Sequence, residues 1–371
     1  MTQSHSESTS SSEPIESETF LKAKELSDRI WEHLEGDASK YRMLTGDRPT
    51  GPLHIGHYFG SLANRVKLQN MGIDSFIVIA DYQVLTDRDS VGEIQRHVKE
   101  LVLDYASVGL DPFEHNTTIF CHSQIPELNQ LLLPFSTLVS VSELQRNPTI
   151  KEEAQAMKLS TISACMLTYP IHQAADILFS HGQLVPVGKD QLPHLELSRK
   201  IARRFNQRYS PKSPVFHEPT ALLAEVPMIT GLDGSQKMSK SRNNTINLNM
   251  TEKQTAKAIK RAKTDTDRMI TYDPISRPEV ANLLMLLSLC TDRTPESWAE
   301  EIGDGGGGML KNYLAEHLNT FLAPMRERRR ELEARPDYVR EVLEHGTRRA
   351  REVAIETLDT VRSVMQMNYS L

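Results

Sequence analysis

The sequence predicts an α/β fold in which a Rossmann-like parallel sheet is followed by an all-helical domain. Two observations predict this. Short apolar runs rich in β-branched residues alternate with helical segments from residue 41 to about residue 206. After about residue 243 the alternation stops and helical periodicity continues to the end of the chain. The β-α-β-α order predicts a doubly wound sheet with right-handed crossovers, which binds ligands at the carboxyl ends of its strands.

Individual elements follow from the same patterns. The predicted strands are 42–45, 75–80, 117–121 and 184–187. The predicted helices among them are 55–70, 91–108, 128–144, 161–178 and 191–206. Thr251 and Gln254 have capping-box spacing and predict the start of a further helix. The glycine-rich segment 303–308 is predicted to be a flexible loop.

Composition divides the chain into four parts. Residues 1–19 hold seven Ser, three Thr and four Glu without Lys or Arg, which predicts a disordered acidic tail. Residues 20–40 predict an amphipathic N-terminal helix. Residues 41–243 form the predicted Rossmann-like domain, and residues 244–371 the helical domain.

Charge and cysteine content exclude several classes of protein. The three cysteines form no C-x-x-C pair, which excludes a zinc finger or a disulfide framework and favours a reducing compartment, so we expect the cytoplasm. Apolar runs are too short to span a bilayer, and the N-terminus lacks a secretory signal pattern. The net charge of −6 argues against a broad nucleic-acid binder. Residues 236–268 are nevertheless basic, with nine Lys or Arg and three acidic residues, which indicates either a phosphate or nucleic-acid contact or a solvated helix face.

The first motif that carries chemistry is T-G-D-R-P-T-G-P-L-H-I-G-H-Y-F-G, residues 45–60. A predicted strand ends, a turn follows, and a helix begins at H-I-G-H. Gly56 would let adenine or ribose approach the backbone, and the helix N-terminus favours phosphate. His54 and His57 could donate hydrogen bonds to phosphate oxygens. They could equally be ordinary histidines at a helix start, but the strand-turn-helix context favours ATP.

The second motif is K-M-S-K-S, residues 237–241, within G-L-D-G-S-Q-K-M-S-K-S-R-N-N. Lys237 and Lys240 lie three residues apart on a loop rich in Gly, Ser and Asn. Lysine is a mobile point charge, which suits a group that follows pyrophosphate as it leaves. Taken alone, the segment could also be an exposed basic loop.

Together the two motifs resemble the signature sequences of class I aminoacyl-tRNA synthetases. Residues 167–199 contain L-T-Y-P-I-H-Q-A-A-D-I-L and then L-V-P-V-G-K-D-Q-L-P-H-L-E-L-S-R, which is similar to the tryptophanyl-tRNA synthetase family. The resemblance runs from about residue 42 to 244, with weaker helical similarity beyond. It implies the class I synthetase-type Rossmann-like fold.

The resemblance also implies roles for individual residues. Asp176 would accept the indole N–H, and a site built around that donor rejects phenylalanine because the buried carboxylate would lose its partner. The other implied tryptophan-binding residues are Tyr169, Gln191, Gln83, Gln173, Val185 and Val187, although core packing also explains the two valines. The implied ATP-binding residues are Arg48, Pro49, Thr50, Gly56, His57, Gly188, Lys189, Asp190, Met228, Lys237, Met238, Ser239, Lys240 and Ser241. The implied catalytic residues are His54, His57, Lys237 and Lys240.

Some positions depart from the usual family pattern. Most bacterial members do not end the first motif in histidine, as this chain does at His57. Gln83 stands where many members have a histidine, Gln173 where they have a methionine, and Leu44 where they have an aromatic residue. These departures resemble the divergent second bacterial subgroup. They motivate the hypothesis of an auxiliary copy that resists tryptophan-analogue inhibitors, and the cysteine count excludes the iron–sulfur variant.

The resemblance implies ATP-dependent ligation of L-tryptophan to tRNA(Trp) through a tryptophanyl-adenylate. Mg²⁺ would be carried by ATP, and no residue is expected to hold a resident metal. The family implies a homodimer with tRNA crossing between subunits. The expected tRNA contacts in the helical domain are Lys253, Lys257, Lys260, Arg261 and Lys263. Two alternatives remain, a tyrosyl-tRNA synthetase and a non-catalytic amino-acid sensor on a synthetase scaffold.

Overall fold

The computed structural model describes residues 18–369 apart from 87–91, 157–160, 189–190, 224–228, 235–237, 240–241 and 243. Several predicted site residues lie outside the described residues, namely Lys189, Asp190, Met228, Lys237, Lys240 and Ser241. Most of the predicted acidic tail, residues 1–17, also lies outside them.

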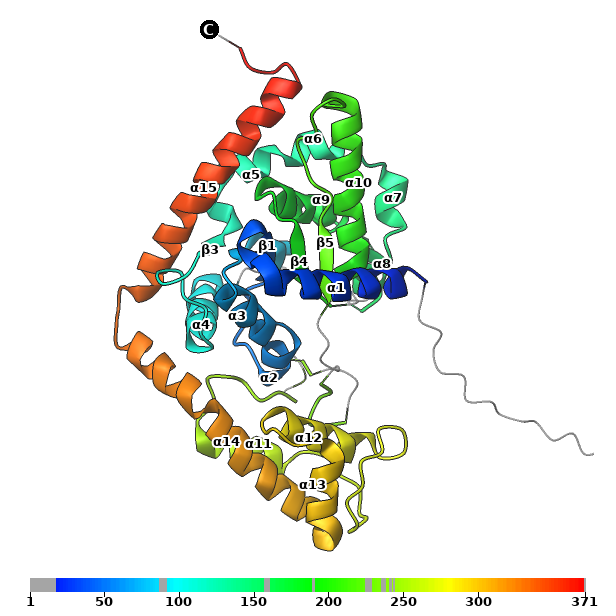
Figure 1. Cartoon of the computed structure of the whole chain (residues 1–371), viewed down its shortest axis with the longest axis vertical. Helices are drawn as coiled ribbons and strands as arrows, with labels where there is room; N and C mark the ends of the chain where they lie inside the picture. Colours follow the sequence, from blue (N-terminus) through cyan, green and yellow to red (C-terminus); the bar gives the residue numbers. More distant parts are fainter. Residues whose placement is uncertain are drawn as a thin grey trace, which may run out of the picture.

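A five-stranded parallel sheet forms the centre of the fold, in the order β3-β2-β1-β4-β5 (Figure 1). Its strands are β1 (Arg42–Asp47), β2 (Asp74–Ile79), β3 (Thr117–Cys121), β4 (Leu184–Val187) and β5 (Thr220–Leu223). Four of them were predicted from the sequence, and β5 was missed. The observed parallel sheet, followed along the chain by helices, confirms the predicted fold class.

The strand order places a switch point between β1 and β4. From β1 the chain adds β2 and β3 on one side, and then β4 and β5 on the other. β1 and β2 are paired from Arg42–Asp74 through Asp47–Ile79, whereas β1 and β4 are paired at Met43–Leu184 near their beginnings. The strands therefore separate towards their carboxyl ends, where doubly wound folds bind ligands.

Helices cover the sheet and extend beyond it. Those up to residue 209 are α1 (Glu18–Asp37), α2 (Ile55–His57), α3 (Ala63–Asn70), α4 (Ile94–Ser107), α5 (Pro126–Gln130), α6 (Leu132–Ser136), α7 (Val141–Gln145), α8 (Pro148–Ala156), α9 (Ala164–Phe179) and α10 (Leu192–Tyr209). The later ones are α11 (Glu252–Lys260), α12 (Pro278–Leu289), α13 (Pro295–Ile302), α14 (Gly306–Glu333) and α15 (Tyr338–Val364). None of the helices in the described part of the chain is long and apolar enough to cross a bilayer.

Two sequence predictions differ from the observed helices. The helix predicted over 128–144 is divided into α5, α6 and α7, and the last begins at a capping box of Ser140 with Glu143. The prediction of a flexible loop over 303–308 was wrong, because Gly303–Gly305 form a 3-10 turn and Gly306 begins α14. Positive φ angles at Gly303 and Gly306 make the turn that joins α13 to α14.

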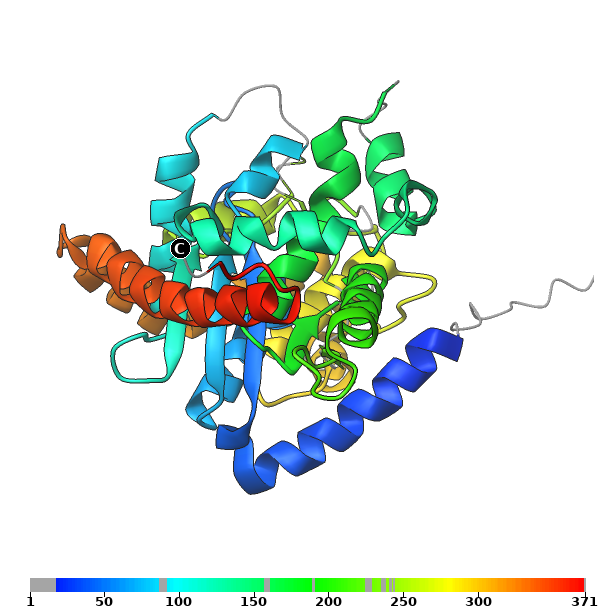
Figure 2. The same ribbon diagram turned by 90° about the horizontal axis from the view of Figure 1, so that it is seen from above.

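Alternate residues of each strand face opposite sides of the sheet. On one side Leu44, Phe76 and Val78 pack against α9 and α10, and α15 joins the same core. In Figure 2, α15 (orange to red) and α1 (dark blue) lie apart from each other at the periphery of the sheet. On the other side the strands pack against α1, α3 and α4. Ser27 of α1 accepts a hydrogen bond from the backbone N–H of Leu223, at 2.9 Å, and thereby ties α1 to the edge strand β5.

Candidate active site

A cavity of about 440 Å³ opens at the carboxyl ends of β1 and β4. Its lining includes Thr45 to Arg48 from the end of β1, and Val185 to Gly188 from β4 and the residue after it. A volume of this size is typical of small-molecule sites. The cavity therefore occupies the switch point at which the fold is expected to bind its ligand.

One face of α9 provides much of the polar lining. Tyr169, Gln173 and Asp176 follow one another at intervals of four and three residues, so they project from the same side of the helix into the cavity. Gln173 Nε2 lies 3.4 Å from Oε1 of Gln191, and the Tyr169 hydroxyl lies 3.1 Å from Nε2 of His194. All seven residues assigned to the tryptophan pocket line this one cavity: Gln83, Tyr169, Gln173, Asp176, Val185, Val187 and Gln191.

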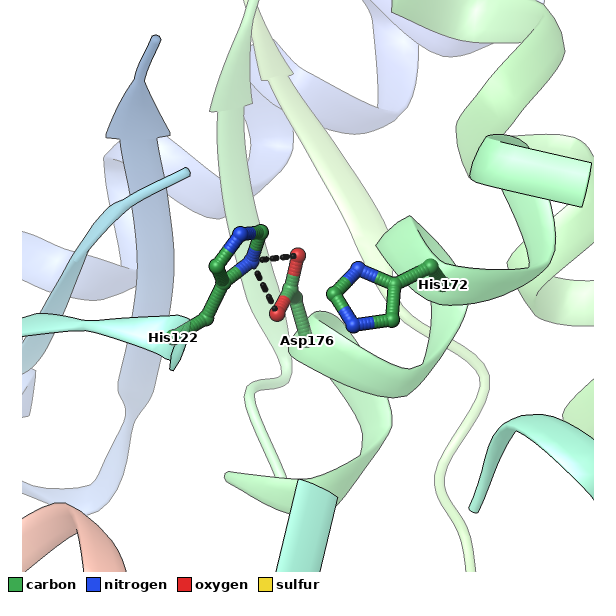
Figure 3. Close-up of side chains that lie close together, drawn as sticks. All are labelled: His122, His172 and Asp176. Atoms are coloured by element: carbon green, nitrogen blue, oxygen red, sulfur yellow. Dashed lines mark hydrogen bonds and ion pairs between the residues drawn. The ribbon is translucent and has the colours of Figure 1, made fainter. Parts of the chain in front are cut away.

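Asp176 is nearly inaccessible, with 2% of its surface exposed, and it pairs with His122. Nδ1 of His122 lies 3.1 and 3.2 Å from the two carboxylate oxygens, as Figure 3 shows. On the other side of the ring, the backbone N–H of Tyr82 donates to Nε2 at 2.9 Å. Because Nε2 accepts a hydrogen bond, the proton of the neutral ring is on Nδ1 and is donated to Asp176.

His122 was not singled out in the sequence. Burial lowers the pKa of its imidazole, but Asp176 and Asp81 raise it, and the net pKa lies above the ordinary value. The signal that could have found it is its position, since His122 directly follows β3, and the carboxyl ends of strands carry ligand sites in this kind of fold.

His172 completes a group of three potential metal ligands with His122 and Asp176, whose ligand atoms lie within 4.8 Å of one another. The hydrogen bonds fit a different arrangement. A metal on Nδ1 of His122 would require that nitrogen to lose its proton while Nε2 still accepts from Tyr82, which leaves an anionic ring. His172 instead directs Nε2 to Oδ1 of Asn129 at 2.8 Å, and burial lowers its pKa.

The first sequence motif forms the expected strand-turn-helix. After β1 and the turn, the helix begins at Ile55, and His57 Nδ1 accepts from the backbone N–H of His54 at 3.2 Å. The two imidazole centroids are 3.7 Å apart. The helix continues through a π-helical turn, Tyr58–Leu62, into α3. Turns of this kind are frequent at functional sites.

The described part of the second motif packs against the first motif. A Cβ atom added at Gly56 would stand 3.6 Å from Sδ of Met238, which is buried in the same core as Ile55. Ser239 donates its backbone N–H to Oδ1 of Asn244 at 2.8 Å. The chain then pairs with the first motif, because Ile55 N donates to Ile246 O, and Leu248 N donates to Leu53 O, each at 2.9 Å.

Some of the described residues that were predicted to bind ATP line the cavity, and others lie beside it. Arg48 and Gly188 line the cavity. Pro49 is buried, and Thr50 donates its backbone N–H to Arg48 O at 2.8 Å. Among the described residues, the cavity lining does not include His54, Gly56, His57, Met238 or Ser239, which lie beside it at the contact between the two motifs.

An ion pair that the sequence analysis missed lies at the β1 end of the cavity, between the buried Arg65 and the partly exposed Asp47. Oδ2 of Asp47 accepts hydrogen bonds from Arg65 Nη1 and from the Tyr105 hydroxyl, each at 2.6 Å. Burial alone would raise the pKa of Asp47, but the charge and hydrogen bond of Arg65 lower it to about 2. Arg65 has the sequence context of an ordinary exposed helix residue, although only 3% of its surface is exposed.

Trp31 of α1 also lines the cavity. Lys67 Nζ lies 4.6 Å from the centroid of its ring, a cation–π contact between α1 and α3.

Comparison with known proteins agrees with this geometry. Residues 37–323 match the family of class I tRNA synthetases for W and Y. A tryptophan–tRNA ligase from Treponema pallidum is 41% identical over 334 residues, covering 88% of this chain and 97% of the relative. One from Thermotoga maritima is 40% identical over 335 residues, covering 88% and 100%.

Solved structures give the same result. Tryptophanyl-tRNA synthetase from Campylobacter jejuni, in complex with ADP and tryptophan, superimposes with a TM-score of 0.76 at 30% identity and covers 88% of this chain and 99% of that one. A tyrosyl-tRNA synthetase from Archaeoglobus fulgidus, with a TM-score of 0.61 and 19% identity, shares the fold. Since the family match spans most of the sequence, this chain belongs to the class I tRNA synthetases of the tryptophan and tyrosine group.

Proposed function

We propose that this chain ligates L-tryptophan to tRNA(Trp) at the expense of ATP, through a tryptophanyl-adenylate. The observation that carries the proposal is the buried carboxylate of Asp176, which borders the cavity at the switch point and is oriented by His122. A substrate with a ring N–H donates a hydrogen bond to such a carboxylate. A substrate with an all-carbon ring would displace water from the carboxylate and give it no hydrogen bond in return. The relatives that are tryptophan–tRNA ligases support this specificity.

The reaction needs positioning and charge more than a protein nucleophile. The carboxylate of tryptophan attacks the α-phosphate of ATP, and pyrophosphate leaves. A ribose hydroxyl of the tRNA then attacks the acyl carbon of the adenylate, the acyl–phosphate bond breaks, and AMP leaves. Arg48, the glycine at 188 and the turn before His54 are our proposed ATP contacts, since Arg48 and Gly188 line the cavity. We extend the same role to Pro49, Thr50, Gly56, Met238 and Ser239 at the contact between the motifs.

Lys237 and Lys240 fall outside the described residues, but the chain on both sides of Lys240 is anchored. Met238 is buried beside Gly56, and residues 246–248 pair with residues 53–55. We propose that both lysines, with His54 and His57, stabilise the leaving pyrophosphate. Ser241, Lys189, Asp190 and Met228 are further proposed contacts of ATP.

We propose that Mg²⁺ arrives on the ATP phosphates. Within the described part of the chain, the carboxylates that line the cavity are Asp47 and Asp176. Arg65 and Tyr105 engage Asp47, and His122 engages Asp176. Both carboxylates are therefore already engaged by protein groups. This arrangement fits a metal bound by the oxygens of the substrate better than a metal bound by a set of protein ligands.

Pyrophosphate exchange against all twenty amino acids tests the specificity. Tryptophan alone should support exchange, and Asp176→Asn should lower kcat/KM for tryptophan while it leaves the KM for ATP unchanged. Exchange with tyrosine alone would establish the tyrosyl alternative, and the absence of exchange with every amino acid would favour a sensor.

For tRNA we propose a contact on the helical domain, residues 244–371. Lys253, Lys257, Lys260 and Arg261 are exposed on or directly after α11, and Lys263 is exposed but pairs with Glu279 at 2.8 Å. Replacing Lys257 and Lys260 with Glu should weaken tRNA binding and reduce its salt dependence, without an effect on pyrophosphate exchange. Unchanged tRNA affinity would exclude this surface.

We also propose a homodimer in the cytoplasm. Leu133 of α6 and Val141 of α7 are 75% and 59% exposed, which is unusual for large apolar side chains and fits a surface covered by a second subunit. Sedimentation of the wild type and of a Leu133→Glu, Val141→Glu variant tests this. A monomeric wild type would contradict the proposal.

A further inference from the structure

His122 contacts the carboxylate of Asp176 but, among the described residues, is not part of the cavity lining. None of its surface is exposed. A bound amino acid would therefore touch Asp176 and not His122. Any effect of His122 on recognition must act through Asp176.

Backbone contacts fix the orientation of the His122 ring. The loop after β2 supplies the Tyr82 N–H to Nε2, at 2.9 Å. The same loop is tied to the loop after β3, because Asp81 accepts hydrogen bonds from the backbone N–H and the hydroxyl of Ser123. The ring cannot rotate or change tautomer without the loss of these contacts, so Nδ1–H stays directed at Asp176.

We propose that His122 is a positioning residue for amino-acid recognition, which holds the carboxylate of Asp176 as an oriented acceptor for a ring N–H. The inference rests on the proposed role of Asp176. Nδ1–H lies nearly equidistant from both carboxylate oxygens and fixes the plane of the group, which leaves further lone pairs of those oxygens for the substrate. Selectivity for an indole over a ring without N–H then depends on a residue that does not touch the substrate.

His172 offers a matched control. Its ring lies 4.7 Å from that of His122 in an edge-to-face contact, and Figure 3 shows it on the other side of Asp176. Its Nε2 bonds to Asn129, a contact that the amide of a glutamine can reproduce. His172→Gln therefore removes an imidazole from the same group of side chains without removing the His122 hydrogen bond.

The experiment compares pyrophosphate exchange for L-tryptophan and for its benzothiophene analogue, in which sulfur replaces the ring N–H. The full chain is used as wild type, His122→Leu, His122→Asn, His172→Gln and Asp176→Asn. His122→Leu should raise the KM for tryptophan about 10- to 100-fold, the range for a lost hydrogen bond to a charged group. It should leave kcat and the KM for ATP near the wild type and abolish the preference over the analogue.

His122→Asn should restore most of the preference, because the asparagine amide nitrogen occupies nearly the place of Nδ1. His172→Gln should retain it. If His122→Leu keeps the preference while Asp176→Asn loses it, the positioning role is wrong and the role of Asp176 stands. If Asp176→Asn keeps it, the proposed role of Asp176 fails first. If His122→Leu and His172→Gln lowered exchange equally, and to the same extent for tryptophan and for the analogue, His122 would have only a packing role and the inference would be overturned.

Discussion

Arg329 joins α14 to the sheet region through a network of charges in which its pair with Asp104 is buried. Its guanidinium bonds to Asp104 and Glu100 of α4, and Nε bonds to Glu333 one turn later on α14. Oδ2 of Asp104 in turn accepts the backbone N–H of Leu53 at 2.8 Å, directly before the H-I-G-H motif. We predict that Arg329→Met destabilises the protein strongly, because it removes the cation from this group.

The magnitude follows from burial. Asp104 is fully buried and the side chain of Arg329 is 8% exposed, so solvent cannot replace the lost partner. Removal of one partner from a buried ion pair costs about 3–5 kcal/mol. The neighbouring Arg330 is the control, since its pair with Glu327 is 70% and 59% exposed. Arg330→Met should cost about 0–1 kcal/mol.

Urea denaturation followed by circular dichroism measures both effects as changes in the free energy of unfolding. Fluorescence adds a local probe, because Trp298 lies on α13 and Trp31 on α1. Asp104→Asn in the Arg329→Met background should recover part of the lost stability, since the uncompensated charge is gone. Equal losses in Arg329→Met and Arg330→Met would refute the reasoning, because burial would then make no difference.

Two further predictions concern packing and pH. Gly346→Ala should destabilise α15 against the sheet by about 1–3 kcal/mol or more, since the added Cβ would stand 1.8 Å from the backbone O of Ile119. Gly308→Ala on α14 meets no atom within 4 Å and should be stabilising by up to about 1 kcal/mol, and urea midpoints compare the two. Asp47, whose pKa Arg65 holds at about 2, should contribute its full stability above about pH 4 and lose it as the pH falls towards 2. The stability difference between wild type and Asp47→Asn, measured from pH 7 to 2, should therefore be constant at first and shrink in acid. A difference that already shrinks above about pH 5 would contradict the low pKa.

The strands could be predicted where their composition differed from that of a helix. The β-branched run S-F-I-V-I-A is unmistakable and became β2, whereas T-A-L-L of β5 is short and has residues common in helices. Gly303 to Gly308 suggested a loop because glycine weakens a helix. Packing of α14 overrides that preference, since Leu310 and the leucines at intervals of four after it are fully buried.

The site could be predicted where the residues are close in sequence or belong to a motif. Tyr169, Gln173 and Asp176 share one helix, so their common face follows from helical spacing. His122 and Arg65 are different. His122 meets Asp176 because β3 and α9 pack together in the fold, 54 residues apart in the chain. A single sequence holds no local pattern for such a pair.

The protonation of His122 separates the effect of its charge from that of its geometry. Burial lowers its pKa, but Asp176 and Asp81 raise the net value above the ordinary one. The charged ring is therefore favoured in the folded protein, and its contribution to stability is present below about pH 6.5 and lost as the pH rises through the folded pKa. The second proton goes to Nε2, where it replaces the hydrogen bond from the Tyr82 N–H and can pair with Oδ1 of Asp81, 3.4 Å away. Nδ1–H remains directed at Asp176 in both states, and His172, whose own pKa is lowered, adds no charge near neutrality.

If geometry governs recognition, the KM for tryptophan stays constant from about pH 6 to 8 while stability changes. A KM that follows the titration would show that the charge of His122, more than its direction, sets the affinity.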